Sequence, residues 1–173
     1  MEDKNGRGLL ERVQVAVKPL TAECNYRLET VEYGTYYRDV EVKLVSEEMA
    51  ILLQGKLSQH TGVNCYFIIH SLNKTFDTKY LFQALEIDIP IKKGDFIRDL
   101  NLEQFKEGTH RDYKEIEYLL KRTGFIEEVT RLCIELKQKL PEIYPLFNLD
   151  TIDETIRRYT SEFRRHKQYG GMF

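Results

Sequence analysis

The period of the hydrophobic pattern changes near the middle of the chain, and this change limits the possible folds more than any other feature. Up to about residue 98, apolar residues mostly recur at every second position, as in strands with one buried face. From about Asp99 onward they recur at intervals of three and four, as in amphipathic helices. Because strands and helices are segregated rather than alternating, the pattern predicts an α+β fold and not a doubly wound sheet.

The first half predicts a mostly antiparallel sheet of about five strands with one inserted helix. Strands are expected at residues 13–17, 24–33, 40–44, 63–72 and 80–89. Gly34-Thr35 is expected to form a tight hairpin link. The run 63–72 is almost continuously apolar, which predicts a central strand covered on both faces. The inserted helix is expected to begin after Ser46 as N-cap and to end at Gly62, with an apolar face of Met49, Leu52, Leu53 and Leu57.

The second half predicts three or four helices packed on that sheet. One carries apolar residues from Tyr113 to Leu120 and ends at Gly124, where glycine favours a helix stop. A second extends from Phe125 to Leu140, before the helix breakers Pro141 and Pro145. The spacing of Thr151 and Glu154 matches a capping box and predicts a last helix, whose apolar face carries Ile152, Ile156, Tyr159 and Phe163.

The 173 residues fit one domain, expected to include the whole chain from residue 1 to residue 173. Residues 1–98 would form its β-rich half and residues 99–173 its helical half. Disordered ends are expected at 1–8 and 169–173, because these segments lack apolar periodicity or carry Gly170-Gly171.

Charge and cysteine content favour a protein of the cytoplasm. Lys and Arg number 26 and Asp and Glu number 28, which argues against a uniformly basic nucleic-acid coat. The N-terminal residues lack the apolar core of a secretory signal, and no apolar run approaches a membrane span, so no membrane partner is expected. The three cysteines are widely spaced and are expected to be buried free thiols: Cys24, Cys65 and Cys133.

Glu41-Val42-Lys43 is the one short motif that suggests catalysis. In the segment from about residue 24 to residue 71, an E-x-K on a strand before a helix and another strand resembles the core of the restriction-endonuclease-like nucleases. The resemblance implies that Glu41 helps to hold a divalent cation and that Lys43 steadies a water or phosphate. Glu29 or Glu32 would replace the family's second acid, since no Pro-Asp pair is present. The alternative is an ordinary strand whose solvent-exposed face carries opposite charges.

Other combinations of reactive residues indicate no site. His60, Cys65 and His70 lack metal-ligand spacing, and Cys65 and His70 would face opposite sides of a strand. His110 has no adjacent nucleophile, and the common phosphate-binding and nucleophile-elbow motifs are absent. We therefore expect no catalytic residue, no metal site and no cofactor. Tyrosines on the strands either pack on the sheet or anchor a partner.

Four arginines on the last predicted helix form the candidate binding surface. At 100° per residue, they lie on one side, roughly opposite the apolar face: Arg157, Arg158, Arg164 and Arg165. Guanidinium groups bind carboxylates and phosphates, although Glu154 on the same side and Glu162 beside it dilute the charge. The alternative is a solvated helix face.

The sequence thus favours a non-enzymatic binding protein that acts through protein–protein contacts, such as an adaptor, assembly factor, inhibitor or regulatory subunit. The first alternative is a nucleic-acid-binding accessory protein that uses the basic last helix. The second, less favoured, is the metal-dependent nuclease built on Glu41 and Lys43. Self-association into a homo-oligomer is compatible with each of them.

Overall fold

Five antiparallel strands form one sheet in chain order, which confirms the α+β prediction. The computed structural model describes residues 4–34, 39–57, 62–88, 120–121 and 123–170. The strands are β1 (Arg27–Gly34), β2 (Asp39–Val45), β3 (Met49–Lys56), β4 (Asn64–Ile69) and β5 (Lys74–Asp77). The expected hairpin between β1 and β2 is present, while residues 35–38 of its link lie outside the described residues.

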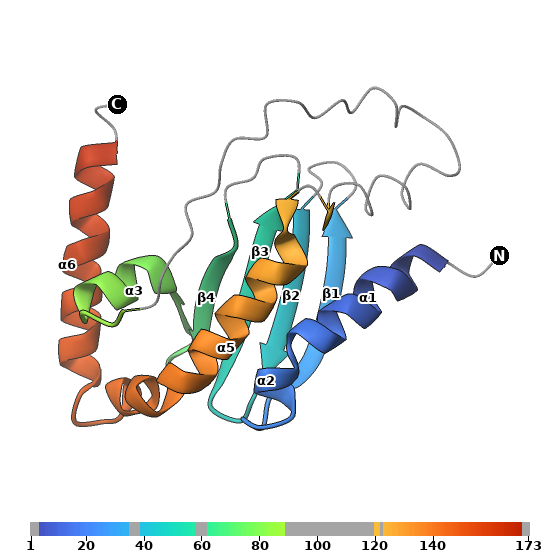
Figure 1. Cartoon of the computed structure of the whole chain (residues 1–173). Coiled ribbons are helices and arrows are strands. Elements are labelled where there is room, and N and C mark those ends of the chain that lie inside the picture. The colour runs from blue at the N-terminus through green and yellow to red at the C-terminus, as the bar shows by residue number, and fades with distance from the viewer. Residues whose placement is uncertain (1–3, 35–38, 58–61, 89–119, 122, 171–173) are drawn as a thin grey trace.

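Helices cover one face of the sheet and one of its edges (Figure 1). On the face lie α1 (Lys4–Ala16), α2 (Lys18–Thr21) and α5 (Phe125–Ile143). Beside the β5 edge lie α3 (Thr78–Ala84) and the C-terminal α6 (Ile152–Gly170), which contact each other. The described residues also include the short 3-10 helices η1 (His70–Leu72), between β4 and β5, and η3 (Tyr144–Phe147), between α5 and α6. In the described part of the chain, no helix is long and apolar enough to cross a membrane.

Alternate residues of the central strands enter one hydrophobic core under α5. Val40, Val42 and Leu44 of β2 are fully buried, as are Phe67 of β4 and Leu53 of β3. The sheet's other face carries half-exposed and polar side chains. The expectation that residues 63–72 form a strand covered on both faces is therefore wrong. Burial in β4 alternates, and Tyr66 and Ile68 on the outer face are only half-buried.

The strand expected at residues 13–17 is wrong, because this segment belongs to α1 and α2. Val13 and Val17 are buried, but Val15 between them is 63% exposed. Leu9, Val13 and Leu20 lie on one buried helical stripe. The alternation of three valines resembles a strand, and the helical spacing becomes visible only over a longer segment.

The helix expected after Ser46 is also wrong, because residues 49–56 form β3. Ser46 closes a tight turn instead: its N–H donates to the Met49 carbonyl over 2.9 Å, and its Oγ accepts from the Met49 N–H over 3.3 Å. The apolar spacing of this segment fits both periods. Pairing with β2 on one side and β4 on the other decides the outcome.

The fifth strand was expected at residues 80–89, but it lies at residues 74–77 and is followed by α3. Asp77 ends the strand and caps the helix, because its Oδ1 accepts from the Lys79 N–H over 3.0 Å. The cap redirects the chain immediately after a strand of four residues.

The helical half agrees more closely with the prediction. Gly124 has a φ of 63° and donates to the Leu120 carbonyl over 3.2 Å, so it ends a helical turn as expected. Helix α5 follows at once but continues through Pro141, which was expected to break it. Residues 113–119 of the preceding predicted helix lie outside the described residues.

Aromatic side chains attach α6 to the sheet through its predicted apolar face. The Tyr159 ring lies 4.9 Å from the Phe76 ring of β5, and its hydroxyl accepts from the Asp77 N–H over 3.0 Å. Phe163 lies 5.3 Å from Tyr80 of α3 in an edge-on arrangement. These contacts confirm that the regular apolar spacing of this helix is its docking face.

Candidate docking groove

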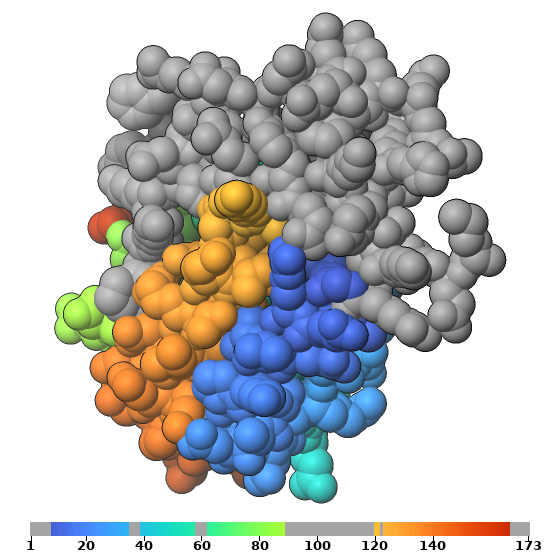
Figure 2. Space-filling model, turned by 45° about the vertical axis from the view of Figure 1, so that its right-hand side comes forward, coloured from blue at the N-terminus to red at the C-terminus, as the bar shows by residue number. Residues whose placement is uncertain are grey.

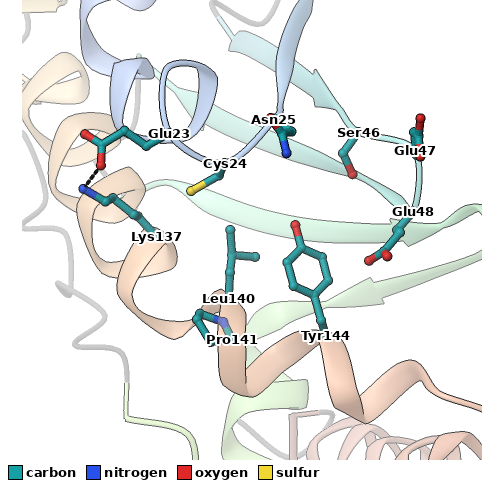
Figure 3. A pocket seen from close by; sticks show the side chains of 10 residues that line it. All are labelled: Glu23, Cys24, Asn25, Ser46, Glu47, Glu48, Lys137, Leu140, Pro141 and Tyr144. Carbon is teal, nitrogen blue, oxygen red and sulfur yellow. Dashed lines mark ion pairs between the residues drawn. The ribbon is translucent and has the colours of Figure 1, made fainter.

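Two adjoining hollows lie where α5 ends and the chain turns toward α6. The first has a volume of about 780 Å³ and the second about 450 Å³, and both are lined by Glu47, Glu48 and Tyr144. We call them together the Tyr144 groove. Its walls come from residues 23–25 after α2, residues 46–48 between β2 and β3, the end of α5, and residues 69–71. Figure 3 shows Tyr144 pointing between these walls in the first hollow.

The wall at residues 46–48 is held from two directions. Besides the Ser46–Met49 turn, the His70 N–H donates to the Glu48 carbonyl over 3.2 Å. The His70 Nε2 lies 3.1 Å from the Ser46 carbonyl oxygen. This turn therefore holds its backbone in place while the Glu47 and Glu48 side chains remain exposed.

The wall after α2 depends on a left-handed residue. Asn25 has a φ of 59°, a conformation that asparagine tolerates better than most residues. It reverses the chain so that the Cys24 and Tyr26 N–H groups both donate to the Leu20 carbonyl, over 3.1 Å and 3.3 Å. Tyr26 thereby enters the core directly beneath the groove and is only 3% exposed.

Tyr144 joins the groove to the core through its hydroxyl. The Tyr144 and Tyr26 hydroxyl oxygens lie 2.9 Å apart and form a hydrogen bond. Burial raises the pKa of Tyr26 far above its usual value, and the bond to Tyr144 adds to the rise. Burial also raises the pKa of Tyr144, against a smaller lowering by the bond to Tyr26. Both phenols are therefore neutral near neutral pH, and the pair serves to orient the Tyr144 ring.

The charge of the groove is negative. Glu23 forms an ion pair with Lys137 of α5, so these two charges largely cancel (Figure 3). Within the described part of the chain, neither Glu47 nor Glu48 has an ion-pair partner. The lining of the groove therefore contains two carboxylates without a described ion-pair partner, and its apolar part, here called its floor, includes Leu140 and Pro141.

The groove offers no activated nucleophile among its described residues. Cys24 donates its thiol to the Pro19 carbonyl over 3.5 Å, and burial raises its pKa. The resulting thiol is a poor nucleophile, because the thiolate is the reactive form.

A leucine projects into solvent beside the second hollow. Leu149 is 95% exposed and follows Asn148, which lines that hollow. Its loop is strongly hydrogen-bonded: the Thr151 and Ile152 N–H groups donate to the Asn148 carbonyl over 3.0 Å and 2.9 Å. The Thr155 hydroxyl donates to the Leu146 carbonyl over 2.7 Å. Leu149 is thus presented to solvent by a well-supported loop.

The predicted arginine row lies on the outer side of α6. Arg157 donates two hydrogen bonds to Glu154, over 2.8 Å and 2.6 Å, and Arg165 contacts Glu162 over 3.2 Å. Arg164 is exposed and Arg158 is half-buried. Glu154 and Glu162, which were expected to dilute the charge, thus each engage one arginine. Binding of an anionic partner by this row stays a prediction.

Glu41 and Lys43 share the outer face of the sheet, as their spacing predicts. Glu41 accepts a hydrogen bond from the Gln54 side chain over 2.6 Å, and Lys43 forms an ion pair with Glu29 over 3.0 Å. The strand–helix–strand order that the nuclease resemblance implied is wrong, because the segment after β2 is the strand β3. Among the residues that the structure describes, no three His, Cys, Asp or Glu side chains form a group suited to a metal.

The cysteines agree with the expectation of free thiols, and two of the three are buried. The three cysteines are free, with Cys65 and Cys133 buried and Cys24 partly exposed. Burial raises the pKa of Cys65, and that of Cys133 to about 12. His60 and His110 lie outside the described residues.

Sequence reasoning missed the groove itself. Glu47 and Glu48 directly follow Ser46, where the sequence predicts a helix rather than a turn, and nothing in the local sequence distinguishes Tyr144. The available signal was Leu149, an apolar residue between Asn148 and Asp150 in a segment without apolar periodicity.

The buried phenols predict a loss of stability in alkali. As the pH rises above about 10, an unfolded tyrosine loses its proton while buried Tyr26 keeps it, so the free energy of unfolding falls. One such group lowers it by about 1.4 kcal/mol in total between pH 9 and pH 11, and by about 1.4 kcal/mol for each further pH unit while Tyr26 stays protonated. We expect urea unfolding followed by circular dichroism to show a shallower decline between pH 9 and pH 11 in Tyr26→Phe than in the unmodified protein. Parallel declines would show that Tyr26 titrates normally.

Comparison with known proteins finds no matching family model, no similar curated protein and no similar solved structure.

Proposed function

We propose that this protein is a non-enzymatic binding protein that acts through protein–protein contacts, with the Tyr144 groove and Leu149 as its docking surface. The observation that carries the proposal is the 95% exposure of Leu149 on a hydrogen-bonded loop beside an open groove. A loop whose backbone is already hydrogen-bonded loses less conformational freedom on binding, so burial of its apolar side chain contributes more to affinity.

The surroundings of Leu149 fit the usual composition of a protein interface. Apolar residues near the centre and polar residues at the rim characterise such surfaces. Here Leu149 and the 37% exposed Leu72 of η1 supply apolar contacts near the second hollow, and Glu47 and Glu48 supply a charged rim. The groove alone is smaller than a standard interface, so the partner would also contact the surface around it.

The proposal is tested by comparing two exposed aliphatic residues at different places on the surface, Leu149 and Val15. Leu149→Ser removes the groove-side apolar group, and Val15→Ser removes a 63% exposed aliphatic group from α1. Neither substitution changes the charge, and both should alter stability by less than about 0.5 kcal/mol. We expect the partner captured by the unmodified protein in extracts of its source cells to bind Leu149→Ser at least about tenfold more weakly.

The control variant Val15→Ser should retain that partner at full level. Equal capture by both variants would contradict the assignment of the docking surface. Loss of capture in Val15→Ser alone would place the interface on α1 instead.

A further inference from the structure

Resting on the function proposed above, we infer that the Tyr144 groove binds a basic side chain, an arginine or a lysine, in a segment of the protein partner. The charge would lie beside Glu47 and Glu48, and the aliphatic stem would lie along the apolar floor toward Tyr144.

Charge complementarity determines the sign of the ligand. The described titratable groups that line the two hollows are Glu23, Glu47, Glu48, Lys137 and His70, together with the neutral side chains of Cys24 and Tyr144. Since Lys137 pairs with Glu23, two carboxylates remain for a cation. An acidic or phosphorylated segment would meet repulsion from both, with no free lysine or arginine in the described lining to offset it.

The shape and composition of the groove favour a side chain over a simple ion. The exposed Pro141 and the half-buried Tyr144 provide apolar surface in the first hollow, which suits the methylene stem of lysine or arginine. The half-exposed Tyr144 ring offers an aromatic face of the kind that attracts cations. A hard metal ion would require several converging oxygen ligands, and the described residues contain no such group.

The rigidity of the rim supports the same assignment. The Glu47–Glu48 turn is held by the Ser46–Met49 hydrogen bonds and by His70. The backbone that carries the two glutamates is therefore already ordered, so less backbone ordering is required when a cation arrives.

Two synthetic peptides test the inference directly. One has the sequence Ala-Leu-Arg-Leu-Ala with blocked ends, and the other carries glutamate in place of arginine. Binding is followed by chemical-shift changes in the ¹⁵N-labelled full-length protein at low ionic strength. We expect the arginine peptide to bind at least tenfold more tightly, with shifts concentrated at residues 23–25, 46–49, 69–72 and 140–149. Added salt should weaken it.

Paired variants assign the binding to the rim. Glu47→Gln/Glu48→Gln should lower affinity for the arginine peptide at least fivefold, while Glu11→Gln/Glu32→Gln, which removes two exposed glutamates elsewhere, should have less than a twofold effect. Equal binding of both peptides, no binding of the arginine peptide, or equal effects of the two paired variants would overturn the inference. If Leu149→Ser loses the natural partner but the arginine peptide does not bind, the proposed function stands and this inference fails.

Discussion

Truncation of Phe67 to alanine is expected to lower the free energy of unfolding by about 3–5 kcal/mol. Phe67 lies at the centre of β4, is fully buried, and contacts Phe82 of α3 edge-on with ring centroids 5.7 Å apart. Its removal would leave a cavity between the sheet and α3 that the surrounding strands cannot easily fill. Urea denaturation followed by circular dichroism measures the loss.

The neighbouring residue provides the control. Ile68 points to the outer face of the sheet and is half-buried, so Ile68→Ala should lower the free energy of unfolding by less than about 1.5 kcal/mol. A loss as large as that of Phe67→Ala would show that a further layer covers the outer face. That result would restore the sequence-based expectation of a strand buried on both sides.

Substitution of Gly55 by alanine is expected to lower the free energy of unfolding by about 1–3 kcal/mol. A Cβ atom on Gly55 would lie 2.5 Å and 2.7 Å from two ring carbons of Phe125, which is 3% exposed. Glycine at this point of β3 therefore allows the start of α5 to approach the sheet. The effect can be measured by thermal and urea denaturation.

A smaller side chain at position 125 should relieve this clash. Phe125→Leu alone should destabilise the protein through lost packing, but Gly55→Ala/Phe125→Leu should be more stable than the sum of the two single effects predicts. Strict additivity in this double-mutant cycle would contradict a direct contact between the two positions.

The elements that the sequence predicted correctly are those in which one period extends over many residues. Helix α6 repeats its apolar face at Ile152, Ile156, Tyr159 and Phe163, and α5 does so over five turns. Strand β2 alternates regularly through Val40, Val42 and Leu44. In each of these elements the periodic pattern of apolar residues is too long to arise by chance.

The wrong assignments fall on short windows that fit both periods. Val13, Val15 and Val17 alternate, yet the buried residues Leu9, Val13 and Leu20 reveal a helix only when the window is extended. Residues 49–57 satisfy a helical spacing, but their antiparallel pairing with β2 and β4 outweighs local preference.

The groove depends on contacts that no local pattern contains. Tyr26, Glu48 and Tyr144 come from three separate segments and meet only because α5 crosses the sheet beside the β2–β3 turn (Figure 1). Figure 2 shows that α1, α2 and α5 pack side by side. The grouping of the four arginines on one side of α6, by contrast, follows from helical geometry alone, although Arg158 is half-buried there.

Site-specific photocrosslinking is the most direct measurement of the docking surface. A photoreactive amino acid is placed at position 149 and, in a separate protein, at position 15, and both are irradiated in the source cells. Position 149 should give one dominant protein adduct that excess unmodified protein suppresses, and mass spectrometry should place a second contact on residues 46–48 or 144. Adducts at position 15 without a suppressible adduct at position 149 would contradict binding at the Tyr144 groove.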